Sequence, residues 1–423
     1  MKKLIKKSIN KIQQDKFLTS SMILFCGSII VGGINYIYQF LTARMLSVEY
    51  FGELQSLLAV FTVTAVFTGT ISTVLVKYTA DYKAIGQMNK IYSLFILLTK
   101  KITIASIIFF VVFIIFSSCI AGFLNIPSNW PLIIIGIAFL FTFPGSINSG
   151  ILRGLQNFKE LTIISIISSV LKLLLAILLI KLGFEINGAI GAVTLATVVG
   201  YLISFVPLKS LFKRQKEVIQ TKEIIKYSIP VFFTLLFTGL LTSLNVILVK
   251  HYFPAQTAGE FGALIILGNI IYFLTGPIAG VMFPMAADAH KSLTFPIKIL
   301  KKALILFILI GLAIVAFYFL FPDFIIKTLV GAKFLSTSGY LGWVGLSMFL
   351  YSLVTLFSSY FLSIGKVKAT YFVGIGAVLQ IVLICIFHST LWQVIGTMNI
   401  VMAIVLILLV SYFIWIYCLC PKS

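Results

Sequence analysis

Acidic residues, histidines and cysteines are scarce in this chain of 423 residues. It contains 11 Asp and Glu against 32 Lys and Arg, three histidines that lie far apart, and five cysteines without a disulfide or metal-binding spacing. No glycine-rich phosphate loop is present either. We therefore expect no metal, no cofactor, no direct use of ATP and no catalytic constellation, and we predict that the protein is not an enzyme.

Long polar stretches are also missing. The longest gaps between apolar runs, residues 77–101 and 209–227, are too short for a soluble catalytic domain. The basic N-terminal segment leads into a full-length apolar run and has no small-residue cleavage site, so we do not expect it to be a removed signal peptide.

Long hydrophobic runs dominate what is present. Sixty per cent of the residues are hydrophobic and 10% are charged, which leaves too little polar surface for a soluble protein. The runs approach the roughly 20 residues needed to cross about 30 Å of hydrocarbon. We predict an all-α integral membrane protein with about twelve transmembrane helices, at residues 19–42, 53–76, 102–123, 131–151, 161–182, 187–208, 229–249, 260–284, 303–321, 339–362, 370–388 and 394–417.

The basic residues indicate the orientation. Of the 32 Lys and Arg, 26 fall in segments on one side of the predicted spans and five on the other, and Lys172 lies within a span. The positive-inside rule then places both termini in the cytoplasm and makes the span count even. Because the net charge of +21 is distributed over short loops rather than on one soluble face, it does not indicate a nucleic-acid partner.

An internal repeat appears when the chain is shifted by 207 residues. Gly52-Glu53 then aligns with Gly259-Glu260, and Ala80-Asp81 aligns with Ala287-Asp288. A weaker match near a shift of 208 places Lys172 over Gln380. With six spans each, the halves have the same orientation, and we predict two lobes related by an axis along the membrane normal with a cavity between them. The predicted divisions are an N-terminal lobe (1–208), a basic cytoplasmic linker (209–227) and a C-terminal lobe (228–423).

Several short motifs resemble those of the polysaccharide and O-antigen flippases, which belong to the multidrug/oligosaccharidyl-lipid/polysaccharide exporter superfamily. The motifs are ARMLSVEYFG (43–52), ILRGLQNF (151–158), GAIGA (188–192), YSIP (227–230), NVILV (245–249) and FP (283–284). The resemblance covers essentially the whole chain. It departs in the seventh span, where many relatives carry Asp and this chain has Asn245.

This resemblance implies a MATE-like architecture in a cell membrane and the movement of a polyprenyl-linked glycan from the cytoplasmic to the outer leaflet. Alternating access of the two lobes would be the mechanism. Membrane lipids and glycan-assembly enzymes would be the other partners. Coupling to a Na⁺ or H⁺ gradient is open, since the departure at Asn245 puts an ion site there in doubt.

Lys172 is the strongest candidate for substrate binding. A Lys at the centre of a span costs roughly 2.5–3.5 kcal/mol on translocon-derived scales, so such a residue is expected to face a polar cavity. It could anchor the phosphate of a lipid-linked glycan, or it could form a structural hydrogen bond with a neighbouring helix.

Three further cations are candidates for substrate binding. Arg44 and Lys250, at the outer ends of spans one and seven, could receive the head group near the exit, or they could be ordinary interfacial cations. Arg153, in the cytoplasmic loop after span four, could contact the incoming pyrophosphate, although the positive-inside rule alone also explains a cation there.

Four acids are candidates for ion coupling or gating. Glu53 and Glu260 begin spans two and eight, where the helix dipole alone favours an acid. Asp81 and Asp288, at the inner ends of the same spans, could form a cytoplasmic gate or be ordinary interfacial charges.

Four amides lie in apolar runs and could line a glycan path. Asn35 and Gln39 share a face of span one, and Asn245 and Gln380 lie in spans seven and eleven. Hydrogen bonds between helices are the alternative role.

Two other functions are weighed against the flippase. A cation-coupled multidrug or small-molecule exporter would need buried carboxylates, and spans one and seven contain none. A membrane-embedded glycan polymerase or ligase would need a large external loop, whereas the longest outer segment is 322–338.

Overall fold

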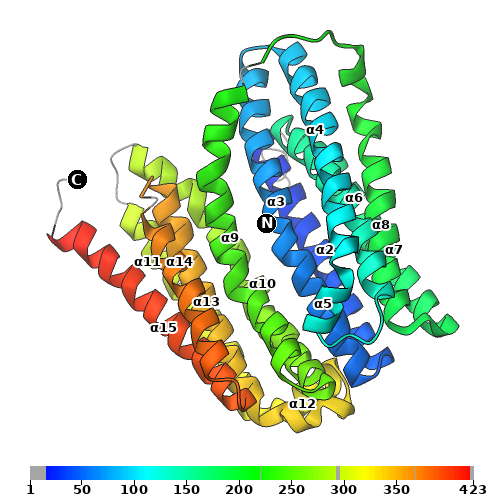
Figure 1. Cartoon of the computed structure of the whole chain (residues 1–423). Coiled ribbons are helices and arrows are strands. Elements are labelled where there is room, and N and C mark those ends of the chain that lie inside the picture. The colour runs from blue at the N-terminus through cyan, green and yellow to red at the C-terminus, as the bar shows by residue number, and fades with distance from the viewer. Residues whose placement is uncertain (1–15, 220, 292–295, 367, 420–423) are drawn as a thin grey trace, which may run out of the picture. The chain divides into compact units, whose positions relative to one another are not determined.

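The computed structural model describes residues 16–219, 221–291, 296–366 and 368–419, and these are organised as helices joined by short connections (Figure 1). The long helices are α2 (Lys16–Met45), α3 (Val48–Ala84), α4 (Met88–Ile115), α6 (Trp130–Gly154), α7 (Phe158–Leu179), α8 (Glu185–Ser204), α9 (Thr221–Tyr252), α10 (Ala255–Lys291), α11 (Pro296–Leu320), α13 (Ser338–Ser363), α14 (Ala369–Ile386) and α15 (Leu391–Ile414). Shorter pieces are α5 (Ser117–Phe123), η1 (Ile180–Phe184), η2 (Val206–Lys213), α12 (Pro322–Leu329), η3 (Ala332–Thr337) and η4 (Trp415–Leu419).

The helices account for the twelve expected spans. Among the described residues, 11 stretches are long and apolar enough to cross a membrane, and the longest of them, Phe158–Lys213, contains both α7 and α8. The chain reverses between these two at Gly183, whose φ is +88°. Glycine adopts this left-handed conformation without steric cost, so the break is encoded locally.

Several helices extend well beyond the apolar runs that predicted them. α3 and α10 have 37 residues each, which at 1.5 Å per residue is about 55 Å. Residues 77–101, expected to form a connection between two spans, are mostly helical. α3 continues to Ala84 and α4 begins at Met88, so the connecting turn is short. The apolar run marks the hydrocarbon thickness, whereas the helix ends where its backbone turns, here at Gly86 with φ +73°.

The described chain forms two compact units. Unit 1 combines the chain up to Thr42 with Thr64–Leu235, and unit 2 combines Ala43–Val63 with the chain from Leu236 onward. The three divisions predicted from the repeat follow sequence similarity rather than contacts, and they stay a prediction.

In unit 1, α6 packs against α4 and α8, and α7 packs against α8. Two glycines of α6 allow α3 to approach closely. A Cβ at Gly150 would lie 2.8 Å from the Leu75 Cβ and 3.0 Å from the Ser72 carbonyl oxygen, and one at Gly154 would lie 2.5 Å from the Thr79 Cβ. Small residues four apart are typical of tightly packed transmembrane helices.

In unit 2, α13 is the central helix and packs against α10, α11 and α15 (Figure 1). A second close approach joins the start of α3 to α10. A Cβ at Gly52 would lie 2.6 Å from the backbone nitrogen of Gly259, and one at Gly259 would overlap the Val48 carbonyl oxygen. Gly52 and Gly259 are matched by the 207-residue repeat, so this contact joins two equivalent positions.

The basic segment after α8 is held against α4 in unit 1. Leu208 and Leu211 of η2 are fully buried in the cluster that contains Leu94 and Phe95 of α4. Further along, the backbone nitrogen of Glu217 donates to the Ser93 hydroxyl at 2.6 Å. The segment predicted as a linker is therefore packed over its first part.

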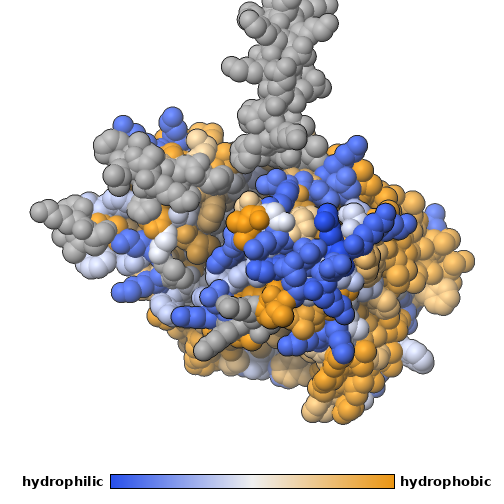
Figure 2. All heavy atoms as spheres, turned by 90° about the horizontal axis from the view of Figure 1, so that it is seen from above, coloured by the Kyte–Doolittle hydropathy of each residue, from blue (hydrophilic) through white to orange (hydrophobic). Residues whose placement is uncertain are grey.

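The surface is divided into hydrophilic and hydrophobic regions, as expected for a protein in a bilayer. Seen from above, hydrophilic side chains gather over the helix ends, and hydrophobic ones cover the flanks (Figure 2). Large apolar side chains such as Ile108, Leu174 and Leu309 are more than half exposed on their helices. Surfaces of this kind suit contact with lipid chains.

Candidate functional site

Lys172 lies between helices of unit 1 rather than pointing outward into lipid. Fourteen residues separate it from the start of α7, which at 1.5 Å per residue is about 21 Å along the helix. Its ammonium group donates a hydrogen bond to the Asn35 side-chain oxygen of α2. The same nitrogen lies 4.4 Å from the centre of the Tyr38 ring.

The Tyr38 ring is a fixed platform for this cation. Tyr38 is 1% exposed, and its hydroxyl donates to the Ala189 carbonyl oxygen of α8 at 3.2 Å. Helices α2, α7 and α8 thus determine together where the ammonium lies. A cation over an aromatic face gains about 0.5–2 kcal/mol, which offsets only part of the cost of a Lys at this depth.

No carboxylate of the described chain forms an ion pair with Lys172, which is half-buried. Its partners are one neutral amide and one ring. A cation in such surroundings attracts an anionic ligand strongly, because its charge is poorly screened. This arrangement can bind a phosphate.

Unit 2 has an equivalent contact without charge. Gln380 of α14 donates from its side-chain nitrogen to the Asn245 side-chain oxygen of α9, and also to the Leu241 carbonyl oxygen at 3.4 Å. The repeat shift of 208 pairs Lys172 with Gln380, and the shift of 207 pairs Tyr38 with Asn245. The same two helix positions therefore meet in each half, and only the first carries a cation.

The amide pair in unit 2 is buried and incompletely hydrogen-bonded. Asn245 is 0% and Gln380 2% exposed. Within the described part of the chain, the Gln380 side-chain oxygen has no hydrogen-bond partner. The pair offers oxygen atoms but no carboxylate at the position where the resembled family often has Asp.

Arg44 has a structural contact in unit 2. Its guanidinium donates to the carbonyl oxygens of Lys327, Thr328 and Leu329 at the end of α12. In return, the Lys333 ammonium donates to the carbonyl oxygens of Arg44 and Leu46 at the end of α2. These cations satisfy carbonyl groups that a helix end leaves unpaired. A head-group role for Arg44 stays a prediction.

Glu53 and Lys250 lie together in the interior of unit 2. They are 5% and 1% exposed, and their charges interact. The repeat-related Glu260 instead accepts a hydrogen bond from the Ser336 hydroxyl at 2.7 Å. The two acids matched by the repeat thus have different surroundings.

The remaining predicted residues are not brought to Lys172 by any described contact. Arg153 and Asp81 are exposed at the ends of α6 and α3, and Gln39 is half-buried one turn beyond Asn35. The side chain of Asp288 lies outside the described residues.

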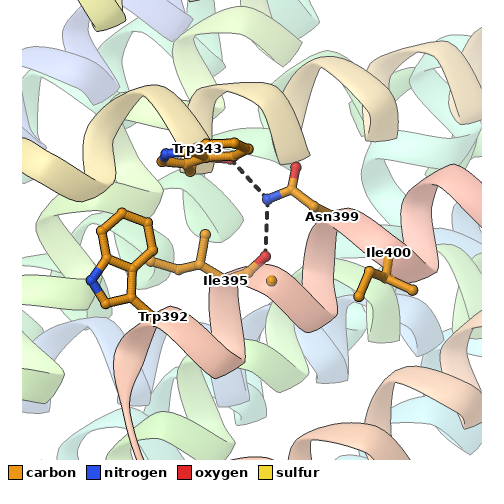
Figure 3. Close-up of a pocket in the computed structure, with 6 residues that line it drawn as sticks. Trp343, Trp392, Ile395, Asn399 and Ile400 are labelled. Atoms are coloured by element: carbon orange, nitrogen blue, oxygen red, sulfur yellow. Dashed lines mark hydrogen bonds between the residues drawn. The ribbon is translucent and has the colours of Figure 1, made fainter.

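A groove in unit 2 has another character. It encloses about 300 Å³ and is lined by Trp343 of α13 and by Trp392, Ile395, Gly396, Asn399 and Ile400 of α15 (Figure 3). The Asn399 amide nitrogen donates to the Ile395 and Trp343 carbonyl oxygens at 2.9 and 3.1 Å. The walls are apolar and carry no charge, so the groove suits a hydrocarbon chain and gives no means of selecting an anionic head group.

The comparisons with known proteins identify the family. A family described as "Polysaccharide biosynthesis protein" matches residues 17–290. The chain belongs to this family. It is also 24% identical, over 385 residues, to a protein of Methanocaldococcus jannaschii described as an uncharacterized membrane protein, with 86% of this chain and 89% of that protein covered.

Solved structures agree on the fold of this polysaccharide biosynthesis protein. A multidrug resistance MATE family transporter of the MOP superfamily, in an inward-facing conformation, has a TM-score of 0.80 at 14% identity, with 95% of this chain and 99% of that one covered. The lipid II flippase MurJ, in an inward closed conformation, gives 0.73 at 18% identity, with 94% and 87% covered. A MOP superfamily transporter from Pyrococcus furiosus gives 0.61 at 16% identity, with 94% of each chain covered. The protein is a multi-pass membrane protein with the all-helical, two-lobed MATE-like fold.

Sequence reasoning missed two parts of the site in this family member. Tyr38 was not predicted to lie beneath Lys172, although the repeat pairs it with Asn245. Lys333 was not predicted to contact α2, because its hydrogen bond to the Leu46 carbonyl oxygen joins residues 287 apart in sequence.

Proposed function

We propose that this protein flips a polyprenyl phosphate- or pyrophosphate-linked oligosaccharide from the cytoplasmic to the outer leaflet by alternating access, for the synthesis of a cell-surface polysaccharide. The observation that carries the proposal is Lys172, a cation deep in a span whose contacts are a neutral amide and a ring. The family membership and the likeness of the fold to a lipid II flippase support it.

The chemistry of this cargo matches the site. Its phosphate is the anion that the Lys172 ammonium lacks among its described protein contacts. A charge-assisted hydrogen bond contributes about 1.5–3 kcal/mol. Asn35, already bound to the ammonium, fixes its position and has an amide nitrogen suited to a phosphate or sugar oxygen.

Energy coupling to a Na⁺ or H⁺ gradient is part of the proposal. Two carboxylates of unit 2 are engaged by protein groups, since Glu53 interacts with Lys250 and Glu260 accepts a hydrogen bond from Ser336. A coupling ion would have to displace one of these contacts. If a Na⁺ or H⁺ gradient drives translocation, we expect the coupling ion to act at the Glu53 or the Glu260 contact. Replacing that acid should then remove the response of the translocation rate to the gradient.

The protein acts in this proposal without chemistry on the glycan. A cation-coupled multidrug or small-molecule exporter is less well supported, because the interior cation Lys172 contacts a neutral amide and a ring and so favours an anionic cargo.

The test is translocation of a fluorescent polyprenyl diphosphate-linked N-acetylglucosamine in liposomes, followed by bleaching with an impermeant reductant. We expect Lys172→Met to slow translocation by about 10- to 150-fold, the equivalent of one charge-assisted hydrogen bond, and Lys172→Arg to retain most of the rate. Lys181→Met, at an exposed position near the end of the same helical stretch, is the matched control. Translocation by Lys172→Met at the rate of the unchanged protein would remove the basis of the proposal.

A further inference from the structure

Three tyrosines lie together in unit 1, where α3 ends and α9 begins. The ring centres of Tyr78 and Tyr227 are 6.4 Å apart with an interplanar angle of 81°, and those of Tyr78 and Tyr82 are also 6.4 Å apart. The Lys77 ammonium lies 3.8 Å from the centre of the Tyr227 ring and 5.4 Å from that of Tyr78. We refer to Tyr78, Tyr82 and Tyr227 as the tyrosine cluster.

The rings of the tyrosine cluster are held on one side and accessible on the other. All three pack against the buried core that contains Leu75, Leu152 and Ile224. Each ring is nevertheless only half-buried. Packing therefore orients the rings while part of each stays available to a ligand.

The three hydroxyls are available as well. Over the described residues, no protein group hydrogen-bonds to the hydroxyl of Tyr78, Tyr82 or Tyr227, whereas buried tyrosines elsewhere do find partners. The Tyr38 hydroxyl donates to the Ala189 carbonyl oxygen and the Tyr318 hydroxyl to the Leu267 carbonyl oxygen.

Groups of both charges surround the cluster. The carboxylates of Asp81 and Glu223 interact electrostatically with the Tyr78 and Tyr82 hydroxyls, and Lys77 supplies a cation. Carboxylates accept hydrogen bonds and an ammonium donates them. The cluster thus combines half-buried tyrosine rings with a cation that lies over the face of Tyr227 and with carboxylates near the hydroxyls of Tyr78 and Tyr82.

We propose that the tyrosine cluster binds a sugar residue of the cargo before translocation. This inference rests on the proposed function and adds a glycan-binding site at the helix ends predicted to be cytoplasmic. A pyranose has an apolar face of C–H groups that can pack on a ring and hydroxyl groups that both donate and accept. A free phosphate fits less well, because Asp81 and Glu223 repel an anion. Ordinary interfacial tyrosines explain the position of the rings but not their grouping around open hydroxyls and charges.

The test uses the full-length protein in detergent and saturation-transfer NMR with free N-acetylglucosamine, glucose, galactose, mannose and rhamnose at millimolar concentration. We expect saturation transfer to at least one of these sugars. Tyr227→Leu and Tyr78→Leu are each expected to weaken the affinity for that sugar by about 2- to 10-fold, the range that one aromatic contact gives. Tyr227→Phe, which keeps the ring, is expected to lose less.

The matched control is Tyr371→Leu, which removes an exposed tyrosine of α14 in unit 2 and is expected to change nothing. Lys172→Met separates the two proposals, since it is expected to slow translocation and to leave sugar binding unchanged. The inference is overturned if no sugar of the panel receives saturation transfer from the unchanged protein. It is also overturned if Tyr227→Leu and Tyr78→Leu bind sugar as well as Tyr371→Leu does, or if inorganic phosphate binds at the cluster and no sugar does. Size-exclusion profiles confirm that each variant is folded.

Discussion

Replacing Gly259 by alanine tests the closest helix approach in unit 2. The new methyl group would overlap the Val48 carbonyl oxygen and lie 2.9 Å from the Val48 Cγ1. On the partner helix, a methyl group at Gly52 would lie 2.6 Å from the Gly259 nitrogen. The atoms in the way are mostly backbone, so no side chain can rotate to make room. Helices α3 and α10 must separate.

The cost can be bracketed from known overpacking effects. Inserting a methyl group into a close-packed contact costs typically about 1–3 kcal/mol. For a cooperative unit of roughly 200 residues, 1 kcal/mol shifts the Tm by about 2–4 °C. We therefore expect Gly259→Ala to lower the Tm by about 2–12 °C.

The same helix supplies a matched control. A Cβ at Gly280 of α10 would meet nothing within 4 Å. Gly280→Ala is expected to leave the Tm unchanged or to raise it slightly, since alanine is favoured over glycine within helices by about 1 kcal/mol. Thermal unfolding of the purified protein, followed by tryptophan fluorescence, measures both. Equal Tm values for Gly259→Ala and Gly280→Ala would refute the packing argument.

Two further predictions concern charges of unit 2, measured by the same unfolding assay. Glu53→Gln is expected to destabilise by about 3–5 kcal/mol, because it leaves the buried Lys250 without its carboxylate. Replacing Lys250 by methionine as well should recover most of this loss, and a double variant no more stable than the single one would contradict the pairing. Lys333→Met removes hydrogen bonds to two carbonyl groups at the end of α2 and is expected to cost about 1 kcal/mol. Lys327→Met, at an exposed position nearby, is the control, and an equal loss there would show that only surface charge matters.

Much of the fold follows from the sequence because bilayer thickness fixes the length of apolar runs. The runs predicted the helices and the 207-residue repeat predicted two similar halves. Helix ends were less predictable. Lys77 and Lys83 indicate the end of the hydrocarbon, yet α3 continues through both residues to Ala84. Charged residues are compatible with helix once it has left the hydrocarbon, so polarity does not locate the last turn.

Parts of the site were predictable as residues but not as contacts. The apolar surroundings of Lys172 and Asn35 singled out both residues. Their hydrogen bond joins positions 137 apart in sequence, and no local pattern encodes which helices become neighbours. Arg44 shows the same limit, since its predicted place at a helix end is correct while its partners on α12 depend on tertiary packing. The repeat comes closest to a long-range signal, because it relates Tyr38 to Asn245.

The contact of Gly52 with Gly259 has a consequence for how the chain can vary. The two glycines are matched by the 207-residue repeat, so the crossing of α3 and α10 joins equivalent positions, and a larger residue at either one would meet the backbone of the other helix. At another matched pair, Lys172 and Gln380, the two halves carry different residues. Equivalent positions are therefore free to differ where each contacts its own surroundings, whereas this crossing has room for glycine alone on both helices.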